Sequence, residues 1–492
     1  MSAVFPLLQE ADAFRPVHAT GHPIFRWDCV EYAMFYTPGC LCVVGLSDAE
    51  WFETTINPPE APLEFEPNVS VEHDLGGELW RRAELAVAEA RRWQEEPFSP
   101  ECLTLYMNNE CNLGCVYCHT GPSHRPATRL ELEAIAAAAE VVAENCRRKG
   151  RPFYGVFHGG GEPTLHRERV ERALSLLDSV ASAHGVELFR YVATNGVMSE
   201  KKAVWLSRHF DLIGLSCDGP ADIENSQRPR WDGSGTSHVV ERTGRVLSEE
   251  GCRYHVRTTI TGATLHRQAE IADYICQQFS PEEIHYEPVY LGGRTSVATG
   301  LDAHQAGEFV THFLKAREIA KEHGILLTSS GSRPDSIHGP YCHVFRHTLN
   351  LVPGGVATAC FEVTDAAQVE EKGVTIGALN RETGRFEINH SRVQELRRRL
   401  DVIPANCADC FNRYHCVREC PDRCPLDDDT RFGDGAPEPG FRCWAQKALA
   451  YAILRETAER LWSGKVMAGK AGKRVYGTAI LRSVLPVGSG GN

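Results

Sequence analysis

One short cysteine-rich stretch constrains this chain more than any other part of it, Cys111-Asn-Leu-Gly-Cys115-Val-Tyr-Cys118. Three thiolates on one loop can bind three irons of a [4Fe–4S] cube and leave the fourth iron without a protein ligand. A small molecule can be chelated at such an open iron and receive an electron. A structural zinc site is the alternative, with His119 as a further ligand. The loop alone favours the iron–sulfur cluster.

The overall composition is that of a globular protein, and its charge argues against two classes of partner. The chain has 492 residues, 42% of them hydrophobic and 24% charged, a length that predicts two or three domains. Its net charge of -13 argues against general binding to nucleic acid or to an anionic membrane. It contains no apolar run of about 18 residues and no signal-peptide pattern. We therefore expect a cytoplasmic protein with no membrane partner.

The 19 cysteines are unevenly placed, which favours metal or cluster ligation over a disulfide framework. The cytoplasm keeps thiols reduced, so disulfides are not expected. Three cysteines lie in the loop described above, and seven lie between Cys360 and Cys443. Eight others are scattered in apolar surroundings, where a cysteine is typically a small core residue. These eight are Cys29, Cys40, Cys42, Cys102, Cys146, Cys217, Cys252 and Cys276.

From residue 102 onward, short apolar runs alternate with longer helical patterns. Six such strand-then-helix units predict a parallel sheet that curls into an open barrel. The predicted strands are 103–107, 153–157, 186–193, 212–216, 254–260 and 284–289. Chemistry in such folds gathers where the strands end. The cysteine loop and the loops at His158, Thr194, Cys217 and Glu287 all follow predicted strands, so we expect them to share one rim.

The regions on either side of the barrel differ in kind. Residues 1–97 predict a β-hairpin and helices, typical of a module that docks a peptide by strand addition or of a packing extension. A second cysteine region, from Cys342 to Cys443, has little else to form a core, so bound metal must organise it. Its thiol-rich content favours two further iron–sulfur clusters over zinc ribbons. The tail from residue 464 is expected to be disordered.

These motifs resemble those of the radical S-adenosylmethionine (SAM) enzymes with a SPASM domain, a subgroup of peptide maturases and anaerobic sulfatase-maturating enzymes. The first loop matches the family's C-x3-C-x2-C motif, including Tyr117 before the last cysteine. The second region matches the SPASM signature from Cys342, through Gly355 and Cys360, to Cys443. The resemblance implies an α/β fold, in which a partial (β/α)6 TIM-like barrel lies between a small N-terminal α+β domain and a cysteine-rich SPASM domain. The implied boundaries are 1–97, 98–325, 326–463 and a tail at 464–492.

The resemblance also implies cofactors and the residues that hold them. Cys111, Cys115 and Cys118 would hold a [4Fe–4S] cluster whose open iron chelates SAM. The implied SAM contacts are Tyr117, Gly160, Gly161, Glu162, Ser216, Arg228 and Val289. Two auxiliary [4Fe–4S] clusters would bring the total to three. One would use Cys407, Cys410, Cys416 and Cys443, and the other Cys342, Cys360 and Cys420, with Cys424 or an open iron at the fourth position.

The resemblance also implies a reaction that begins with one electron from a ferredoxin- or flavodoxin-type donor. SAM is then cleaved to methionine and a 5′-deoxyadenosyl radical, and this radical removes a hydrogen atom from the substrate. Auxiliary clusters would then accept a second electron. The leading hypothesis is oxidative modification or cross-linking of a ribosomally made precursor peptide. Formylglycine formation is disfavoured because Phe361 stands where sulfatase maturases have an aspartate, although Glu362 is a candidate base. Radical oxidation of a small metabolite is a second hypothesis, and a non-enzymatic electron carrier is a third.

Overall fold

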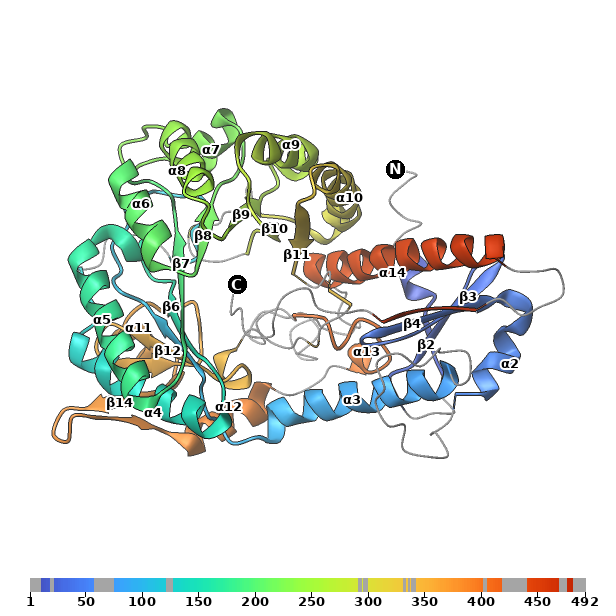
Figure 1. The fold of residues 1–492 in the computed structure, drawn as a ribbon, viewed down its shortest axis with the longest axis horizontal. Helices are drawn as coiled ribbons and strands as arrows, with labels where there is room; N and C mark the ends of the chain where they lie inside the picture. Colours follow the sequence, from blue (N-terminus) through green and yellow to red (C-terminus); the bar gives the residue numbers. More distant parts are fainter. Residues whose placement is uncertain are drawn as a thin grey trace, which may run out of the picture.

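The computed structural model of the chain contains two β-sheets and the helices that cover them (Figure 1). The larger sheet has the strand order β11-β10-β9-β8-β7-β6-β5-β12-β13-β14-β15, and the smaller has the order β1-β2-β3-β4-β16. The predicted α/β class with a parallel sheet is confirmed. The structure describes residues 10–17, 22–56, 75–120, 127–290, 294, 300–330, 333–334, 337, 342–400, 405–417, 440–468 and 476–480.

Six strands of the larger sheet and the helices after them form the predicted strand-then-helix units. The strands are β5 (Cys102–Leu105), β6 (Phe153–Phe157), β7 (Leu188–Thr194), β8 (Leu212–Ser216), β9 (Tyr254–Ile260) and β10 (Glu283–Pro288). Their helices are α4 (Leu132–Lys149), α5 (Arg167–His184), α6 (Glu200–His209), α7 (Ala221–Gln227), α8 (Ser237–Glu249), α9 (Gln268–Gln278) and α10 (Ala306–Glu322). Neighbouring strands all pair in parallel. Figure 1 shows the helices along the outer side of the sheet.

The larger sheet continues beyond these six strands on both sides. At one edge, β11 (Leu326–Ser329) pairs in parallel with β10. At the other, β12 (Thr348–Val352) pairs in parallel with β5 and begins an antiparallel run. That run comprises β13 (Val356–Thr358), β14 (Thr375–Asn380) and β15 (Arg385–Ile388), with α11 (Ala366–Glu371) and α12 (His390–Leu400). One continuous sheet therefore crosses the boundary expected between residues 325 and 326.

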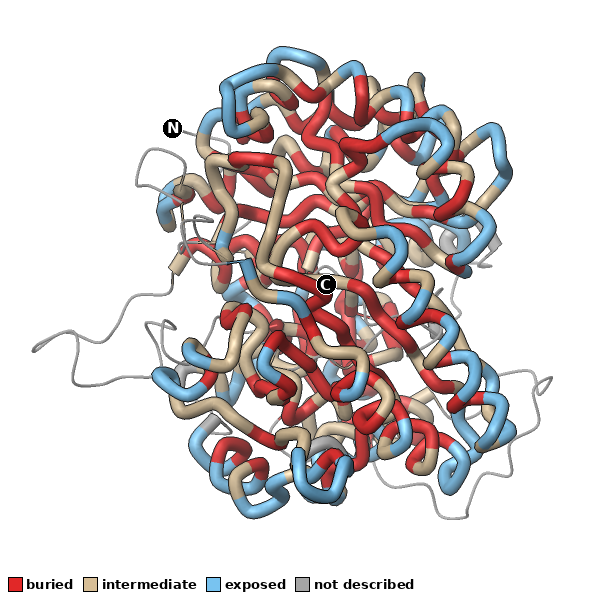
Figure 2. Tube along the Cα trace, turned by 90° about the vertical axis from the view of Figure 1, so that its left-hand side faces the viewer, coloured by how far each residue is buried: buried red, intermediate tan, exposed pale blue. Residues whose placement is uncertain are grey.

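Side-chain alternation divides the barrel strands into a core face and an inner face. On β9, Tyr254, Val256 and Ile260 are buried in the core shared with the helices, whereas His255 and Arg257 are only partly buried. Successive side chains on a strand point to opposite faces, so His255 and Arg257 lie on the inner face of the sheet. Figure 2 shows buried residues gathered inside the molecule and exposed ones along the outer helices.

The smaller sheet combines the two ends of the chain. Its strands are β1 (Arg15–Pro16), β2 (Phe25–Asp28), β3 (Tyr32–Thr37), β4 (Cys40–Gly45) and β16 (Tyr476–Ile480). Residues of β3 alternate between two cores: Tyr32 and Met34 pack with α14 (Phe441–Ala468), while Ala33 and Phe35 pack with α2 (Ala49–Thr54) and α3 (Leu75–Glu95). Figure 1 shows α14 and α3 on opposite sides of this sheet. The N-terminal body is therefore completed by a C-terminal helix and strand.

The tail differs from the expectation of disorder at two places. Helix α14 continues to Ala468, and β16 pairs antiparallel with β4, from Tyr476 opposite Val44 to Ile480 opposite Cys40. An unpaired edge strand presents free N–H and C=O groups, and the sequence of β16 includes β-branched and aromatic residues that favour strands.

In the described part of the chain, no helix has both the length and the apolar character needed to cross a membrane.

Candidate functional site

The cysteine loop after β5 is held directly against the glycine loop after β6. The Gly161 N–H donates to the Asn108 carbonyl, and the Glu162 N–H donates to the Glu110 carbonyl, each over 2.8 Å. In return, the Asn108 side-chain amide donates to the Glu162 carbonyl over 3.1 Å. Hydrogen bonds to the main chain therefore bring two of the predicted rim loops together.

The glycines of the second loop are required by this close approach. Gly160 has a φ of 71°, and a Cβ there would lie 2.5 Å from the Asn108 carbonyl oxygen. A Cβ on Gly161 would lie 1.9 Å from the Glu110 carbonyl oxygen. Both positions clash with backbone atoms, which cannot turn aside as a flexible side chain can. The structure thus gives these glycines a packing role against the cysteine loop.

We expect Gly161→Ala to lower the iron bound per chain after anaerobic reconstitution. The added methyl group must push the Glu110 carbonyl away, which displaces the adjoining Cys111. Overpacking of this kind costs about 1–3 kcal/mol. Gly464→Ala is the control, because a Cβ at this helical position meets nothing within 4 Å. Equal iron content in the two variants would show that the loops do not need this close contact.

The Glu162 carboxylate ties the loop after β6 to the loop after β7. It is buried and accepts hydrogen bonds at Oε1 from the Thr164 N–H (3.1 Å), the Thr164 hydroxyl (2.7 Å) and the Thr194 hydroxyl (2.8 Å). Its Oε2 accepts from the Asn195 N–H over 2.7 Å. Both carboxylate oxygens therefore accept hydrogen bonds from within the protein, and the side chain links the two loops.

The three thiols of the first loop are partly exposed at this rim. The Cys111 carbonyl accepts a hydrogen bond from the Trp231 indole over 2.9 Å, and the Asn195 side-chain amide approaches the Cys111 sulfur at 3.7 Å. Burial raises the pKa of Cys111 to about 11 and that of Cys115 to about 12. Without metal, the Cys111 and Cys115 thiols are thus protonated at neutral pH, so binding of iron to these two must release protons.

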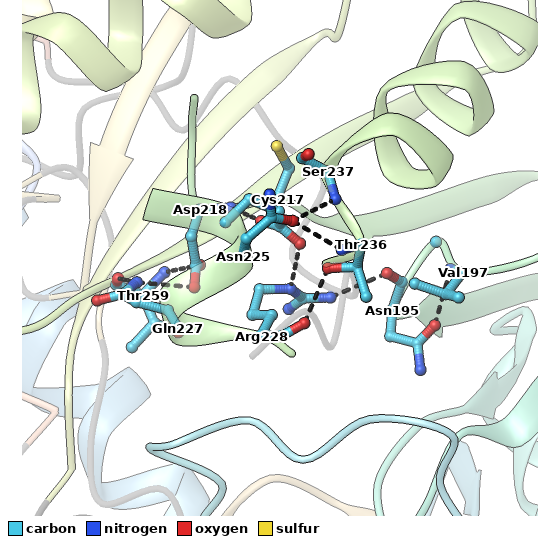
Figure 3. Close-up of polar contacts among 12 residues, drawn as sticks. Asn195, Val197, Cys217, Asp218, Asn225, Gln227, Arg228, Thr236, Ser237 and Thr259 are labelled. Atoms are coloured by element: carbon cyan, nitrogen blue, oxygen red, sulfur yellow. Dashed lines mark hydrogen bonds and ion pairs between the residues drawn. The ribbon is translucent and has the colours of Figure 1, made fainter. Parts of the chain in front are cut away.

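Arg228 lies at the centre of a buried polar network behind the cysteine loop (Figure 3). Its Nε donates to the Glu224 carboxylate over 2.8 Å, one terminal nitrogen donates to the Asn195 carbonyl over 2.9 Å, and the other contacts the Tyr117 hydroxyl at 3.4 Å. Burial raises the pKa of Glu224 to about 7, against the opposing charge of Arg228. All three guanidinium nitrogens therefore have partners within the protein.

Asp218 joins this network to the cysteine loop. The carboxylate is fully buried and accepts hydrogen bonds from the Tyr117 hydroxyl (2.7 Å), the Gln227 side-chain amide (2.8 Å) and the Thr259 N–H (2.9 Å). The Gln227 carbonyl in turn accepts from the Val116 N–H over 2.9 Å. Sequence reasoning noted the loop that contains Asp218 but gave no role to this residue, to Glu224 or to Gln227.

The two other residues implied in SAM contact lie at strand ends of the same rim. Ser216 is the last residue of β8 and stands in register with Arg257 of β9. Val289 follows β10 directly, is buried, and donates its N–H to the Ile260 carbonyl over 2.9 Å. Strand pairing therefore places both residues at the carboxyl ends of the sheet.

Four cysteines of the second region gather at the start of α14. They are Cys407, Cys410, Cys416 and Cys443, the first in α13 (Ala405–Ala408) and the last in the first turn of α14. Burial raises the pKa of Cys443 well above its usual range, and the thiols of Cys416, Cys410 and Cys407 raise it further. The four thiols are thus close enough to interact electrostatically.

The segment that carries these cysteines is docked onto α14. The Val417 N–H donates to the Gln446 side chain over 3.0 Å. Across the described ranges, no three cysteine, histidine or acidic side chains meet the spacing needed to hold a single metal ion. Cys420 and Cys424, two further predicted ligands, lie outside the described residues.

Cys342 and Cys360 lie on either side of the β12–β13 hairpin, whose turn contains Pro353, Gly354 and Gly355. The His343 N–H donates to the Ala359 carbonyl over 3.2 Å. The residues next to the two cysteines are thus hydrogen-bonded to each other. This pairing brings the two ends of the hairpin together, so the cysteine-bearing segments lie side by side.

Glu362, the candidate base, forms an ion pair with Lys372 at 3.2 Å. Its neighbour Phe361 approaches the cysteine loop, with its ring centroid 5.9 Å from that of His119. The Phe361 carbonyl accepts a hydrogen bond from the Tyr106 hydroxyl over 2.7 Å. The side chain directly after Cys360 is therefore aromatic and contacts the residue that follows the first cysteine loop.

Comparison with known families identifies the part of the chain that contains the rim. Residues 105–275 match the Radical SAM superfamily. This part of the chain is a radical SAM domain. It contains the first cysteine loop, the glycine loop and the Arg228 network, so the radical SAM part of the resemblance is confirmed. The match implies that this domain uses a SAM-binding [4Fe–4S] cluster.

Curated relatives match about a quarter to a third of the chain. The cysteine-type anaerobic sulfatase-maturating enzyme of Clostridium perfringens is 25% identical over 169 residues, which cover 33% of this chain and 45% of the relative. A probable GTP 3′,8-cyclase of Methanocella arvoryzae is 29% identical over 119 residues, 24% of this chain and 34% of the relative. The matched part spans less than half of each relative.

Solved structures extend the likeness beyond the radical SAM domain. The structure of native anSMEcpe with bound AdoMet has a TM-score of 0.57 and 18% identity, covering 73% of this chain and 99% of that chain. The structure of native anSMEcpe with bound AdoMet and the Cp18Cys peptide has a TM-score of 0.56 at 18% identity, with the same coverage. At this identity the likeness concerns the fold.

A radical SAM domain uses a [4Fe–4S] cluster and SAM, and the residues of this chain fit that requirement. The donor set is suitable because three partly exposed thiols share one loop. The loop is fixed by the glycine loop, by Trp231 and by the segment after α7, where the Pro229 carbonyl accepts from the Gly114 N–H over 2.7 Å. The thiols are therefore held in place by the surrounding protein.

Strand β10 is joined to the second cysteine region through Arg442, the residue before Cys443. Its guanidinium donates to the Glu287 carboxylate over 2.6 Å and to the Pro288 carbonyl, and lies 3.5 Å from the centre of the Tyr290 ring. Burial opposes ionisation of Glu287, but the charge of Arg442 holds its pKa well below the usual range. This buried ion pair anchors α14 on β10, a link that the sequence reasoning did not find.

Proposed function

We propose that this chain is a radical SAM oxidoreductase that modifies or cross-links a ribosomally made precursor peptide. The observation that carries the proposal is the extent of the structural likeness. The anSMEcpe structures resemble 73% of this chain, well beyond the radical SAM domain, and one of them holds AdoMet together with a peptide. An enzyme of this fold thus binds a peptide together with SAM, and we propose the same for this chain.

Within this proposal, the rim residues hold the cofactors. When bound, the cluster and SAM supply a 5′-deoxyadenosyl radical that removes a hydrogen atom from the substrate. We assign the cluster to Cys111, Cys115 and Cys118, and SAM to Tyr117, Gly160, Gly161, Glu162, Ser216, Arg228 and Val289. The side chain of Glu162 is engaged with its neighbours, so it contributes through its backbone. Arg228 would bind SAM through the guanidinium N–H groups that its hydrogen bonds within the protein leave unused.

We also propose two auxiliary [4Fe–4S] clusters in the second cysteine region. The gathering of Cys407, Cys410, Cys416 and Cys443 at the start of α14 supports the first of them. The second would use Cys342 and Cys360, whose segments lie side by side, with Cys420 and either Cys424 or an open iron. These clusters would take the second electron, so the peptide loses two hydrogen atoms in total. A ferredoxin- or flavodoxin-type protein would supply the first electron.

The domain roles follow from the same proposal. We assign residues 98–325 to SAM cleavage, 326–463 to the auxiliary clusters and 1–97 to docking of the precursor peptide, with 464–492 as a tail. The sheet that begins in residues 1–97 is completed by α14 and β16. Since α14 also carries Cys443, a peptide docked on this sheet would lie on the same framework as an auxiliary cluster.

Formylglycine formation is the second candidate, because a curated relative is named as a sulfatase-maturating enzyme. The residue after Cys360 weighs against it. Phe361 occupies the position where the resemblance calls for an aspartate, and its ring lies between those of His119 and Tyr290 at 5.9 and 6.3 Å. A phenyl ring cannot accept the substrate proton that this chemistry requires.

Mass spectrometry of candidate peptides after co-expression with the chain tests the proposed function. Short open reading frames beside the gene supply the candidates. We expect one peptide to lose about two mass units, and the Cys115→Ala chain to leave that peptide unchanged as a control. Recovery of every candidate at its unmodified mass would contradict the peptide assignment and favour a small-metabolite substrate. A product with cysteine converted to formylglycine would favour the second candidate.

Iron content after anaerobic reconstitution tests the auxiliary clusters. We expect about twelve irons per wild-type chain and about four fewer after Cys443→Ser. The variant should still form 5′-deoxyadenosine from SAM under dithionite, because its first cysteine loop is intact. Cys252→Ser is a matched control, since Cys252 lies away from both cysteine regions and is bonded to the Leu247 carbonyl. A wild-type value of about four irons would refute the three-cluster proposal.

A further inference from the structure

The inner face of the larger sheet carries a band of polar side chains with Arg257 at its middle. Arg257 of β9 stands in register between Ser216 of β8 and His285 of β10. Adjacent strands lie about 4.8 Å apart, and residues in register project to the same face of a sheet. Arg257 is therefore a direct neighbour of Ser216, one of the residues that we assign to SAM.

Arg257 differs from Arg228 and Arg442 in having no bonded counterion among the described residues. Arg228 is paired with Glu224 at 2.8 Å, and Arg442 is paired with Glu287 at 2.6 Å. Glu287 is the inner-face carboxylate on the neighbouring strand, but it also accepts hydrogen bonds from His285 at 3.1 Å and from Ser330 at 2.5 Å. Glu287 is thus already hydrogen-bonded to other groups, and among the described residues the Arg257 guanidinium has no hydrogen-bonded carboxylate of its own.

The inner-face carboxylate nearest in register, Glu287, is bonded to Arg442, and two histidines and a tyrosine around Arg257 carry no charge at neutral pH. Burial lowers the pKa of His158 and that of His255 to about 3, and the charge of Arg257 contributes to both shifts. Burial raises the pKa of Tyr191, whose ring is stacked on His255, to about 12. A partly buried guanidinium without a counterion is unfavourable, and a planar carboxylate is the ligand that matches its geometry best.

We propose that Arg257 binds a carboxylate of the peptide substrate on the inner face of the barrel, beside SAM. The carboxylate is either an acidic side chain or the carboxyl terminus, and a bidentate pair would fix its orientation next to the reacting centre. The inference rests on the proposed function for the presence of SAM at Ser216. It goes beyond that function in naming a chemical group that the substrate must carry.

SAM has a carboxylate of its own, so the experiment must separate the two sources. The probes are N-acetylglutamate N-methylamide and its glutamine analogue, which differ only in the side-chain carboxylate. Each is titrated calorimetrically into unreduced, SAM-saturated holoenzyme. The proteins are the wild type, Arg257→Gln, Arg257→Lys and, as matched control, Arg253→Gln, whose exposed arginine lies just before the same strand and pairs with Glu282. SAM and decarboxylated SAM are titrated into the same four proteins.

We expect the wild type and Arg253→Gln to prefer the glutamate probe over the glutamine probe by about tenfold or more. Arg257→Gln should lose this preference, Arg257→Lys should keep part of it, and the SAM dissociation constant should change less than about twofold. An unchanged glutamate preference in Arg257→Gln, or none in the wild type, would overturn the proposal. Selective weakening of SAM, but not of decarboxylated SAM, would overturn the substrate assignment and give the carboxylate to SAM.

Because these titrations involve no turnover, they are independent of the co-expression test. A wild-type enzyme that leaves every peptide unmodified would contradict the proposed function and leave the measured carboxylate preference unaffected. The visible absorbance of the clusters and the thermal midpoint show whether each variant is folded. The Arg257→Lys protein serves as a second folded variant, because it keeps the positive charge at this position.

Discussion

The Cys115→Ala protein, reconstituted anaerobically, is expected to bind about four fewer irons per chain than the wild type and to form no 5′-deoxyadenosine from SAM under dithionite. We propose Cys115 as the middle ligand of the first loop, so its removal would leave two thiols for a cluster that needs three. The remaining thiols cannot substitute for it, because backbone hydrogen bonds to Pro229 and to Gln227, the last residue of α7, fix the loop on both sides of Cys115.

Cys146→Ala is the control for this experiment. Cys146 is a fully buried thiol on α4 and packs in the core of the same domain, away from the rim. We expect it to keep the wild-type iron content and SAM cleavage, at the modest stability loss of a smaller core side chain. The iron assay and chromatographic detection of 5′-deoxyadenosine are run on both variants. Formation of 5′-deoxyadenosine by Cys115→Ala at the wild-type rate would show that another site cleaves SAM.

Arg228→Met is expected to destabilise the protein by about 3–5 kcal/mol, because it removes one partner of a buried ion pair. The guanidinium and its partner Glu224 are almost fully buried, with 5% and 1% of their side chains exposed. Without Arg228, the Glu224 carboxylate must be protonated or buried unpaired, and Asp218 loses the charge that opposes its own burial. The hydrogen bond from Arg228 to the Asn195 carbonyl is also lost.

Equilibrium denaturation under anaerobic conditions measures this loss. The control is Arg208→Met, which breaks a mainly exposed ion pair with Glu250 and should cost less than about 1 kcal/mol. A double variant, Arg228→Met with Glu224→Gln, should recover part of the stability, because no unpaired buried carboxylate remains at position 224. Equal stability of Arg228→Met and Arg208→Met would contradict the structural role of the network.

The barrel strands could be predicted from the sequence because local residues mark their ends. Pro152 precedes β6 and the glycine run at 159–161 follows it, while Gly219 and Pro220 lie just after β8. Residues that break regular structure, together with apolar runs of strand length, locate such strands closely. The first cysteine loop could be singled out for a related reason, since its three cysteines lie within eight residues of sequence.

The buried polar contacts could not be predicted, because they join residues far apart in the chain. Tyr117 and Asp218 are separated by 101 positions, and Glu287 and Arg442 by 155. No local pattern indicates which distant polar group a buried carboxylate will meet. Strand β16 was missed for the same reason, since its partner β4 lies near the other end of the chain. A short strand of this kind exists only through pairing with an edge.

Transfer of a hydrogen atom from a peptide to the 5′-deoxyadenosyl radical formed from SAM is tested most directly with deuterium. A candidate precursor peptide is made with deuterium on its side-chain and α carbons, and is incubated anaerobically with holoenzyme, SAM and dithionite. We expect 5′-deoxyadenosine heavier by about one mass unit, formed together with a modified peptide. Formation of unlabelled 5′-deoxyadenosine beside an unchanged peptide would contradict the assignment of the peptide as the molecule that receives the radical.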